Sequence, residues 1–186
     1  MEKHKSCSFF GHRNVSISQA LIEELEKCIE NLIINCDTQV FLFGSRSNFN
    51  DICHAIVTKL KGKYPNIKRV VFTCKNENCV LENEKNEMEK IYSYLKNEKV
   101  KLLTFEEEFE YVGKYIAGRA SYIKRNQAMI DSSNYCIFYY DKNYQPQKRK
   151  ATKQSVLSYQ PKSGTAIAFE YAKQKQKIII NLAKQD

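Results

Sequence analysis

Short runs of apolar and β-branched residues alternate along the chain with longer segments in which apolar residues recur every three or four positions. The short runs have the length and composition of buried strands, and the longer segments have the periodicity of amphipathic helices. Strands that alternate with helices favour the α/β class, here a Rossmann-like doubly wound fold with a mostly parallel sheet and helices on both faces. Six strands are predicted, at residues 7–10, 40–43, 69–73, 100–103, 135–140 and 178–180.

The first helix is marked by a cap as well as by its periodicity. Ser16 or Ser18 can cap a segment whose apolar residues between positions 21 and 33 repeat at three and four. A long helical pattern nearer the middle of the chain contains Gly113 and Gly118, which are expected to interrupt it. Beyond the first helix, helices are predicted at about residues 51–61, 88–96 and 105–131.

The chain has 186 residues and contains no internal repeat or linker, so residues 1–186 are predicted to form a single domain. No apolar run approaches the ~20 residues that cross a bilayer, and the N-terminal residues lack the apolar core of a signal peptide. We therefore expect no membrane association. Seven cysteines without the spacing of a disulfide framework favour the reducing cytosol, and so a cytoplasmic protein.

The net charge of +9 is partly local. One segment after Asp141 contains no acidic residue, which raises the local concentration of anionic ligands whatever their identity. A solvated surface loop is the alternative interpretation. Tyr139, Tyr140, Tyr144 and Tyr159 flank this basic loop (residues 142–162), so stacking of nucleic-acid bases is a third. Its cations are Lys142, Lys148, Arg149, Lys150, Lys153 and Lys162.

Three turns carry residues suited to an anion. Two of them follow predicted strands, and the third opens the helix before the last strand. In a doubly wound sheet the carboxyl ends of the strands lie at one edge, where ligands bind. Backbone N–H groups and a helix N-terminus there favour a phosphate, and so a nucleotide or a nucleotide derivative. The turns are Gly11-His12-Arg13, Gly44-Ser45-Arg46 and Ser163-Gly164-Thr165.

Side chains in these turns suggest specific roles. Arg13 and Arg46 offer guanidinium groups that match phosphate oxygens, although both could be ordinary surface arginines. His12 is either a structural hydrogen-bonding residue or a catalyst. The three histidines and seven cysteines show no metal-ligand spacing, and no common nucleotide-binding or nucleophile motif is present. We therefore expect no metal and no separate cofactor.

Four motifs follow one another along the chain: FFGHR, FGS followed by Phe49, RNQAMID and SGT. In this order they resemble the SLOG superfamily, which joins DprA (Smf) and the LOG hydrolases. The similarity is greatest to the YpsA-like branch of small bacterial proteins of unknown function. The resemblance implies a Rossmann-like fold that binds nucleotides or nucleotide-derived ligands. It adds Arg125 and Asn126 of RNQAMID to the expected phosphate-binding residues, and it implies a homodimer or higher oligomer.

The departures from the family pattern bear on catalysis. The resemblance places the catalytic glutamate of the LOG hydrolases at Ala168, while Glu170 lies about 200° further around the helix. Asp131 and Asp141 are candidates for a relocated carboxylate. In the YpsA-like pattern the second strand ends with two glycines and is followed by a G-F-D-like segment; here Ser45 takes the place of a glycine, and Asn48 and Asn50 replace glycine and aspartate.

Three functions remain open. We favour a protein that binds or senses a nucleotide without strong catalysis. The alternatives are a LOG-like hydrolase of nucleoside phosphates, which would be an N-glycosidase of the phosphoribohydrolase type, and a DprA-like protein that binds single-stranded nucleic acid. An aromatic helix at residues 108–123 is a candidate for the oligomer contact, or for packing within one subunit.

Overall fold

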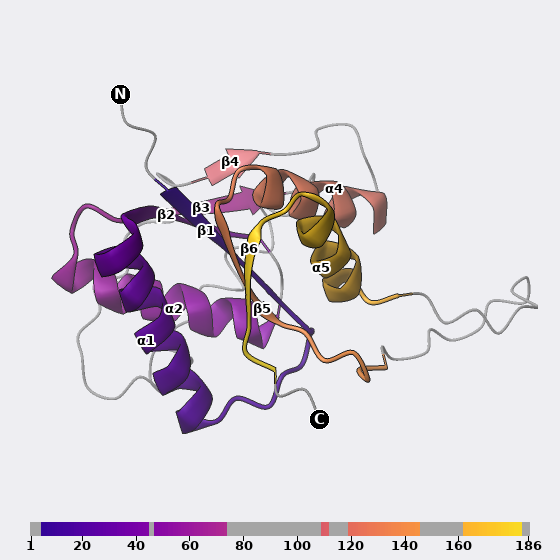
Figure 1. Ribbon diagram of the computed structural model, residues 1–186, viewed down its shortest axis with the longest axis horizontal. Coiled ribbons are helices and arrows are strands. Elements are labelled where there is room, and N and C mark those ends of the chain that lie inside the picture. Colours follow the sequence, from indigo (N-terminus) through magenta and orange to yellow (C-terminus); the bar gives the residue numbers. More distant parts are fainter. Residues whose placement is uncertain (1–4, 45–46, 74–108, 112–118, 146–161, 184–186) are drawn as a thin grey trace, which may run out of the picture.

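The computed structural model describes residues 5–44, 47–73, 109–111, 119–145 and 162–183 (Figure 1). Its centre is a six-stranded sheet in the order β4-β3-β2-β1-β5-β6, and every neighbouring pair is parallel. The predicted doubly wound α/β class is thus confirmed. The strands are β1 (Lys5–Gly11), β2 (Thr38–Phe43), β3 (Lys68–Thr73), β4 (Phe109–Tyr111), β5 (Tyr135–Tyr139) and β6 (Ile178–Asn181).

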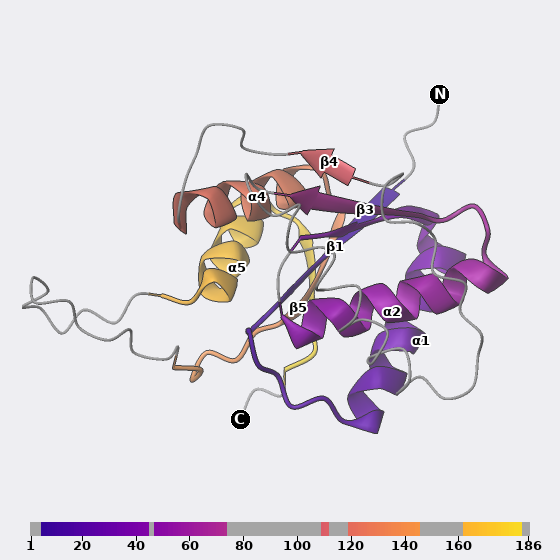
Figure 2. The same cartoon turned by 180° about the vertical axis from the view of Figure 1, so that it is seen from behind.

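The described helices cover both faces of the sheet, with α1 and α2 on one face and α4 and α5 on the other, as the two views in Figures 1 and 2 show. On one face, the helices α1 and α2 pack on alternate residues of the strands, such as Phe9 and Phe41. On the other face, α4 and α5 pack on the residues between them, such as Phe10 and Leu42. The helices are α1 (Gln19–Cys36), α2 (Asn48–Lys63), α4 (Arg119–Asp131) and α5 (Gly164–Gln174).

Capping side chains set the starts of three helices. Ser18, and not Ser16, caps α1 by accepting a hydrogen bond from the N–H of Leu21, and Ser163 caps α5 in the same way. Helix α2 begins three residues earlier than the periodicity predicts, because Ser47 accepts a hydrogen bond from the N–H of Asn50. This earlier start brings the first turn of α2 to the carboxyl end of the sheet.

One predicted helix is wrong over part of its length. Residues 109–111 form the edge strand β4, which pairs with β3, whereas residues 105–131 were predicted to be helical. A single aromatic helix over residues 108–123 is therefore excluded. The conformation of this segment is decided by its pairing with the neighbouring strand, which the periodicity of the sequence does not reveal. The helix predicted at residues 88–96 and the strand predicted at residues 100–103 lie outside the described residues.

The connections reverse their direction between β1 and β5. From β1 the chain passes through α1 on one face to β2, and from β5 it passes through α5 on the opposite face to β6. Such a topological switch point is where doubly wound sheets bind ligands, outside the carboxyl ends of the strands. Of the helices that the structure describes, none has both the length and the apolar character needed to traverse a bilayer.

The buried histidine of α2 makes stability depend on pH. The His54 ring lies edge-on to Phe43, with its centroid 4.7 Å from that of the phenyl ring. Burial, and the positive charge of Arg69 beside it, lower the pKa of His54 from 6.5 to about 3. The folded protein therefore holds this ring neutral over a pH range in which the unfolded chain takes up a proton.

We expect the free energy of unfolding to fall as the pH is lowered from about 6.5, where the unfolded histidine begins to bind a proton. His54 should contribute a slope of about 1.4 kcal/mol per pH unit, and the lowered pKa of His12 acts in the same direction. Urea unfolding at a series of pH values measures this slope. His54→Gln should lower the slope by about 1.4 kcal/mol per pH unit, which corresponds to one proton. An unchanged slope in this variant would contradict the assignment to His54.

Candidate functional site

Gly11, the last residue of β1, is the point at which helices from both faces meet the sheet. On one face, a Cβ atom at this position would lie 2.6 Å from the Cβ and ring atoms of Phe49, in the first turn of α2. On the other face, the Thr165 hydroxyl of α5 donates to the Gly11 carbonyl oxygen at 2.8 Å. Glycine is thus required here by the close approach of Phe49, and the first turns of both helices are fixed beside the switch point.

The first turn of α5 presents donors to this edge. The Ser163 hydroxyl accepts a hydrogen bond from the N–H of Ala166 at 3.0 Å, which leaves the N–H groups of Gly164 and Thr165 without a partner inside the helix. Gly164 is exposed, and a Cβ at its position would meet no atom within 4 Å. Two N–H groups without a partner inside the helix, the positive end of the helix and open space beside the backbone are what an oxyanion needs.

His12 joins the ends of β1 and β5. The N–H of Asp141, which follows β5, donates to His12 Nε2 at 3.0 Å. The imidazole ring stacks on Tyr144, with the ring centroids 3.8 Å apart and the planes 15° from parallel. Burial lowers the pKa of His12, although the carbonyl oxygen of Asp141, 3.2 Å from Nε2, and the Asp141 carboxylate oppose this effect. The structural role that the sequence suggested for His12 is therefore present.

The exit from β5 is held on its other side by β6. The side-chain amide of Asn181 accepts from the N–H of Tyr140 and donates to its carbonyl oxygen, each at 2.9 Å. Tyr140 also stacks on Phe169 of α5, with the centroids 4.5 Å apart. Tyr140 and Asp141 are consequently anchored from both neighbouring strands, and the half-buried rings of Tyr140 and Tyr144 lie beside the start of the basic loop.

The end of β2 contains a second group of the predicted residues. A Cβ at Gly44 would lie 2.9 Å from Met129 Sδ and 3.1 Å from Arg125 Cδ, so α4 approaches this glycine closely. Arg125 is only 3% exposed, and its guanidinium carbon lies 5.2 Å from the Tyr122 ring centroid. In the described part of the chain, the buried Oδ1 of Asn126 has no hydrogen-bond partner. Gly44, Arg125 and Asn126 thus form a group on the α4 side of the sheet.

Asn48 ties the loop after β1 to α2. Its side chain accepts from the N–H of Val15 at 2.9 Å and donates to the Val15 carbonyl at 2.6 Å. Its own N–H donates to the carbonyl of Arg13 at 3.4 Å, while the Arg13 side chain is exposed. The asparagine that departs from the family pattern therefore positions the loop carrying Arg13. Asn50 is buried beside it in the first turn of α2.

Several predicted residues cannot be placed. Ser45 and Arg46, at the centre of the second turn, lie outside the described residues, as do Lys148, Arg149, Lys150 and Lys153 of the basic loop. The two cations at the ends of that loop, Lys142 and Lys162, are described and exposed. The structure thus brings together the first and third turns and leaves the second incomplete.

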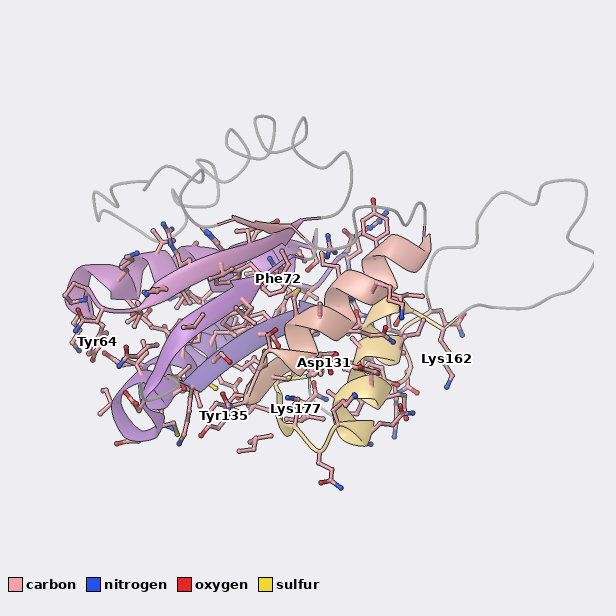
Figure 3. The ribbon with its side chains drawn as sticks, turned by 90° about the horizontal axis from the view of Figure 1, so that it is seen from above. Tyr64, Phe72, Asp131, Tyr135, Lys162 and Lys177 are labelled. Carbon is pink, nitrogen blue, oxygen red and sulfur yellow. The ribbon has the colours of Figure 1, made fainter. Side chains whose placement is uncertain are left out.

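The positions considered for a catalytic carboxylate lie in different parts of the structure. Ala168, to which the resemblance assigns the glutamate of the LOG hydrolases, is buried on the sheet-facing side of α5, and Glu170 is exposed. Asp131 ends α4 near the amino end of β5, where it accepts from the Tyr171 hydroxyl at 3.1 Å, and Figure 3 shows it near Lys177 and away from Lys162. Asp141 does lie at the site, where its carboxylate accepts from the N–H of Asn143 at 2.7 Å.

Sequence reasoning missed the contacts that assemble this edge. Asn48 was interpreted only as a departure from a glycine, and Phe49 only as part of a motif, although one clamps the loop and the other packs against Gly11. The signal available in the sequence was that Asn48 directly follows Ser47, which can cap a helix and so places Asn48 in the first turn of α2. Among the described residues, no group of three or more histidine, cysteine or acidic side chains is placed to hold a metal ion.

Comparison with known proteins agrees with this architecture. The family model YpsA, which describes the YspA SLOG family, matches residues 3–174 and therefore covers both faces of the sheet and the whole of α5. No curated protein is similar enough to this chain to be matched.

Gly11→Ala should destabilise the fold by about 1–3 kcal/mol or more, because the new methyl group meets Phe49 near its own backbone attachment and cannot be avoided by a rotation. Denaturant unfolding measures the loss. Gly62→Ala is the matched control: it lies inside α2, its new methyl group meets no atom within 4 Å, and it should stabilise the helix by up to about 1 kcal/mol. Equal effects of the two substitutions would contradict the packing argument.

Proposed function

The chain belongs to the YspA SLOG family, and on this premise we propose that it binds a nucleotide or nucleotide-derived ligand at the carboxyl ends of β1 and β5. The observation that carries the proposal is the hydrogen bond from Thr165 to the Gly11 carbonyl. It fixes the N-terminus of α5 at the topological switch point, which is where a doubly wound sheet takes up a phosphate.

The surroundings of this turn fit the rest of a nucleotide. The exposed cations Arg13, Lys142 and Lys162 lie on the three segments that meet at this edge, and they favour an anion there. The half-buried rings of Tyr140 and Tyr144 offer apolar faces of the kind on which a base stacks. A helix N-terminus, exposed positive charge and aromatic surface therefore lie at one edge of the sheet, which supports the proposal.

Binding without strong catalysis is the form of the proposal that we favour. An N-glycosidase needs an acid or base beside the bond that it cleaves. Ala168, to which the resemblance assigns the glutamate of the LOG hydrolases, is buried in the apolar cluster of α4 and α5, and Glu170 is exposed. Asp131 lies at the amino end of the sheet, where it is occupied by Tyr171 and Lys175.

The first experiment is a thermal-shift screen of the purified chain against nucleotides, cyclic nucleotides and adenosine-ribose derivatives. A ligand at 100 times its dissociation constant stabilises by about 2.7 kcal/mol, which should raise the melting temperature by roughly 5–10 °C. Gly164→Asp should abolish the shift, because a carboxylate then occupies the open space beside the helix N-terminus. Gly164→Ala adds only a methyl group in the same space and is the control.

Two results would count against the proposal. One is the absence of any shift in the wild-type chain; salt-sensitive binding of single-stranded DNA would then favour the DprA-like alternative. The other is a Gly164→Asp variant that binds as tightly as the wild type, which would place the ligand elsewhere.

We also expect no release of free base when the chain is incubated with the common nucleoside monophosphates, because the described site lacks a carboxylate at position 168. Chromatography of the reaction mixture separates the base from the nucleotide. Release of base that is lost in Arg125→Ala would support the hydrolase instead. Release that persists in this variant would point to a contaminating activity.

A further inference from the structure

We propose that His12 is a ligand-binding residue of fixed tautomer, whose Nδ1–H donates a hydrogen bond to a phosphate oxygen of the nucleotide. This inference rests on the proposed function, and it deepens it by assigning a donor, and by excluding a base, at this position. The two ring nitrogens of His12 lie in different surroundings.

The backbone of Asp141 decides which nitrogen carries the hydrogen. A backbone N–H can only donate, so the 3.0 Å contact from the Asp141 N–H is a hydrogen bond only when Nε2 is unprotonated. In the neutral ring, the hydrogen is then on Nδ1. The Asp141 carbonyl is also 3.2 Å from Nε2, but a hydrogen on that nitrogen would face the N–H of the same residue. The lowered pKa of His12 agrees with a neutral ring at pH 7.

The Nδ1–H group is buried and unsatisfied. His12 is only 3% exposed, and within the residues that the structure describes its Nδ1 atom has no hydrogen-bond partner. A buried donor without an acceptor costs about 1–3 kcal/mol, so such groups are uncommon unless a ligand completes them. His12 directly follows Gly11, whose carbonyl holds the first turn of α5. The unsatisfied donor therefore belongs to the residue that directly follows the anchor of the first turn of α5.

The groups around the ring favour an acceptor atom in the ligand. Tyr144 covers one side of the imidazole, and Tyr140 lies 5.9 Å away between ring centroids. Asp141 is the carboxylate that acts on the ring electrostatically, and residues 163–167 of α5 carry no ionisable side chain. Because the lone pair of Nε2 is already used, His12 has no free acceptor with which to remove a proton. Its available chemistry is donation.

Two substitutions test the roles of Nε2 and Nδ1 separately. The amide of Gln reaches about as far as Nε2, so His12→Gln can keep an oxygen acceptor for the Asp141 N–H while it removes the donor at Nδ1. The shorter amide of Asn reaches about as far as Nδ1, so His12→Asn keeps a donor there and loses the bond to Asp141. Affinity for ligand and melting temperature are measured for both variants and for the wild type, at pH 7.

The ligands are the four common ribonucleoside 5′-monophosphates, each paired with its own nucleoside. We expect His12→Gln to weaken binding of the monophosphate by about tenfold to a hundredfold, as for the loss of a hydrogen bond to a charged group, and to leave binding of the nucleoside unchanged. Its melting temperature should stay near that of the wild type. His12→Asn should show the reverse: a lower melting temperature and an affinity closer to that of the wild type.

Each outcome decides something. Equal affinity of His12→Gln and the wild type for the monophosphate overturns the inference while leaving the proposed function standing. An equal loss for monophosphate and nucleoside overturns the assignment to phosphate. A wild-type chain that binds none of these compounds overturns both proposals. Nitrogen NMR of the wild-type imidazole provides a check that needs no variant: a hydrogen on Nε2, or an Nδ1 signal unmoved by bound monophosphate, contradicts the assignment.

Discussion

The close approach of three elements at Gly11 is the constraint on which the candidate site depends. Phe49 leaves no room for a side chain there, and Thr165 holds the carbonyl from the opposite face. Helices on opposite faces of a sheet do not otherwise contact each other, since the sheet separates them. Both can meet only beyond the end of a strand, and here that strand is β1, at the switch point.

A second layer of contacts is built on this junction. His12 joins β1 to the residue after β5, and Asn181 joins the exit of β5 to β6, so the carboxyl ends of three adjacent strands are fixed relative to one another by side chains. Asn48 does the same for the loop after β1 and the first turn of α2. A rigid edge of this kind suits a binding site, because a preorganised site loses little conformational freedom when its ligand arrives.

The packing of α5 on the sheet supports the proposal of binding over that of catalysis. The buried side chains of Ala168 and Phe169, on the sheet-facing side of α5, belong to the apolar core that holds the helix against Phe10 and Phe138. A glutamate at position 168 would have to bury a carboxylate in that cluster, which is costly without a partner. The N-terminus of α5 thus presents the proposed phosphate site, while Ala168, one turn later, packs in the core.

The sequence by itself determined the elements whose signals are local. A cap at Ser16 or Ser18, a turn at residues 163–165 that opens a helix, helical periodicity and β-branched runs depend on residues a few positions apart, and from them the α/β class followed. Tertiary structure alone decided β4, because a three-residue strand is defined by its pairing with β3 and its residues also fit a helical pattern. It also decided the partners of the site: His12 and Asp141 are 129 residues apart, and Gly11 and Thr165 are 154 apart. Contacts over such separations leave no periodic trace in the chain, since they arise only when the sheet brings the carboxyl ends of its strands together.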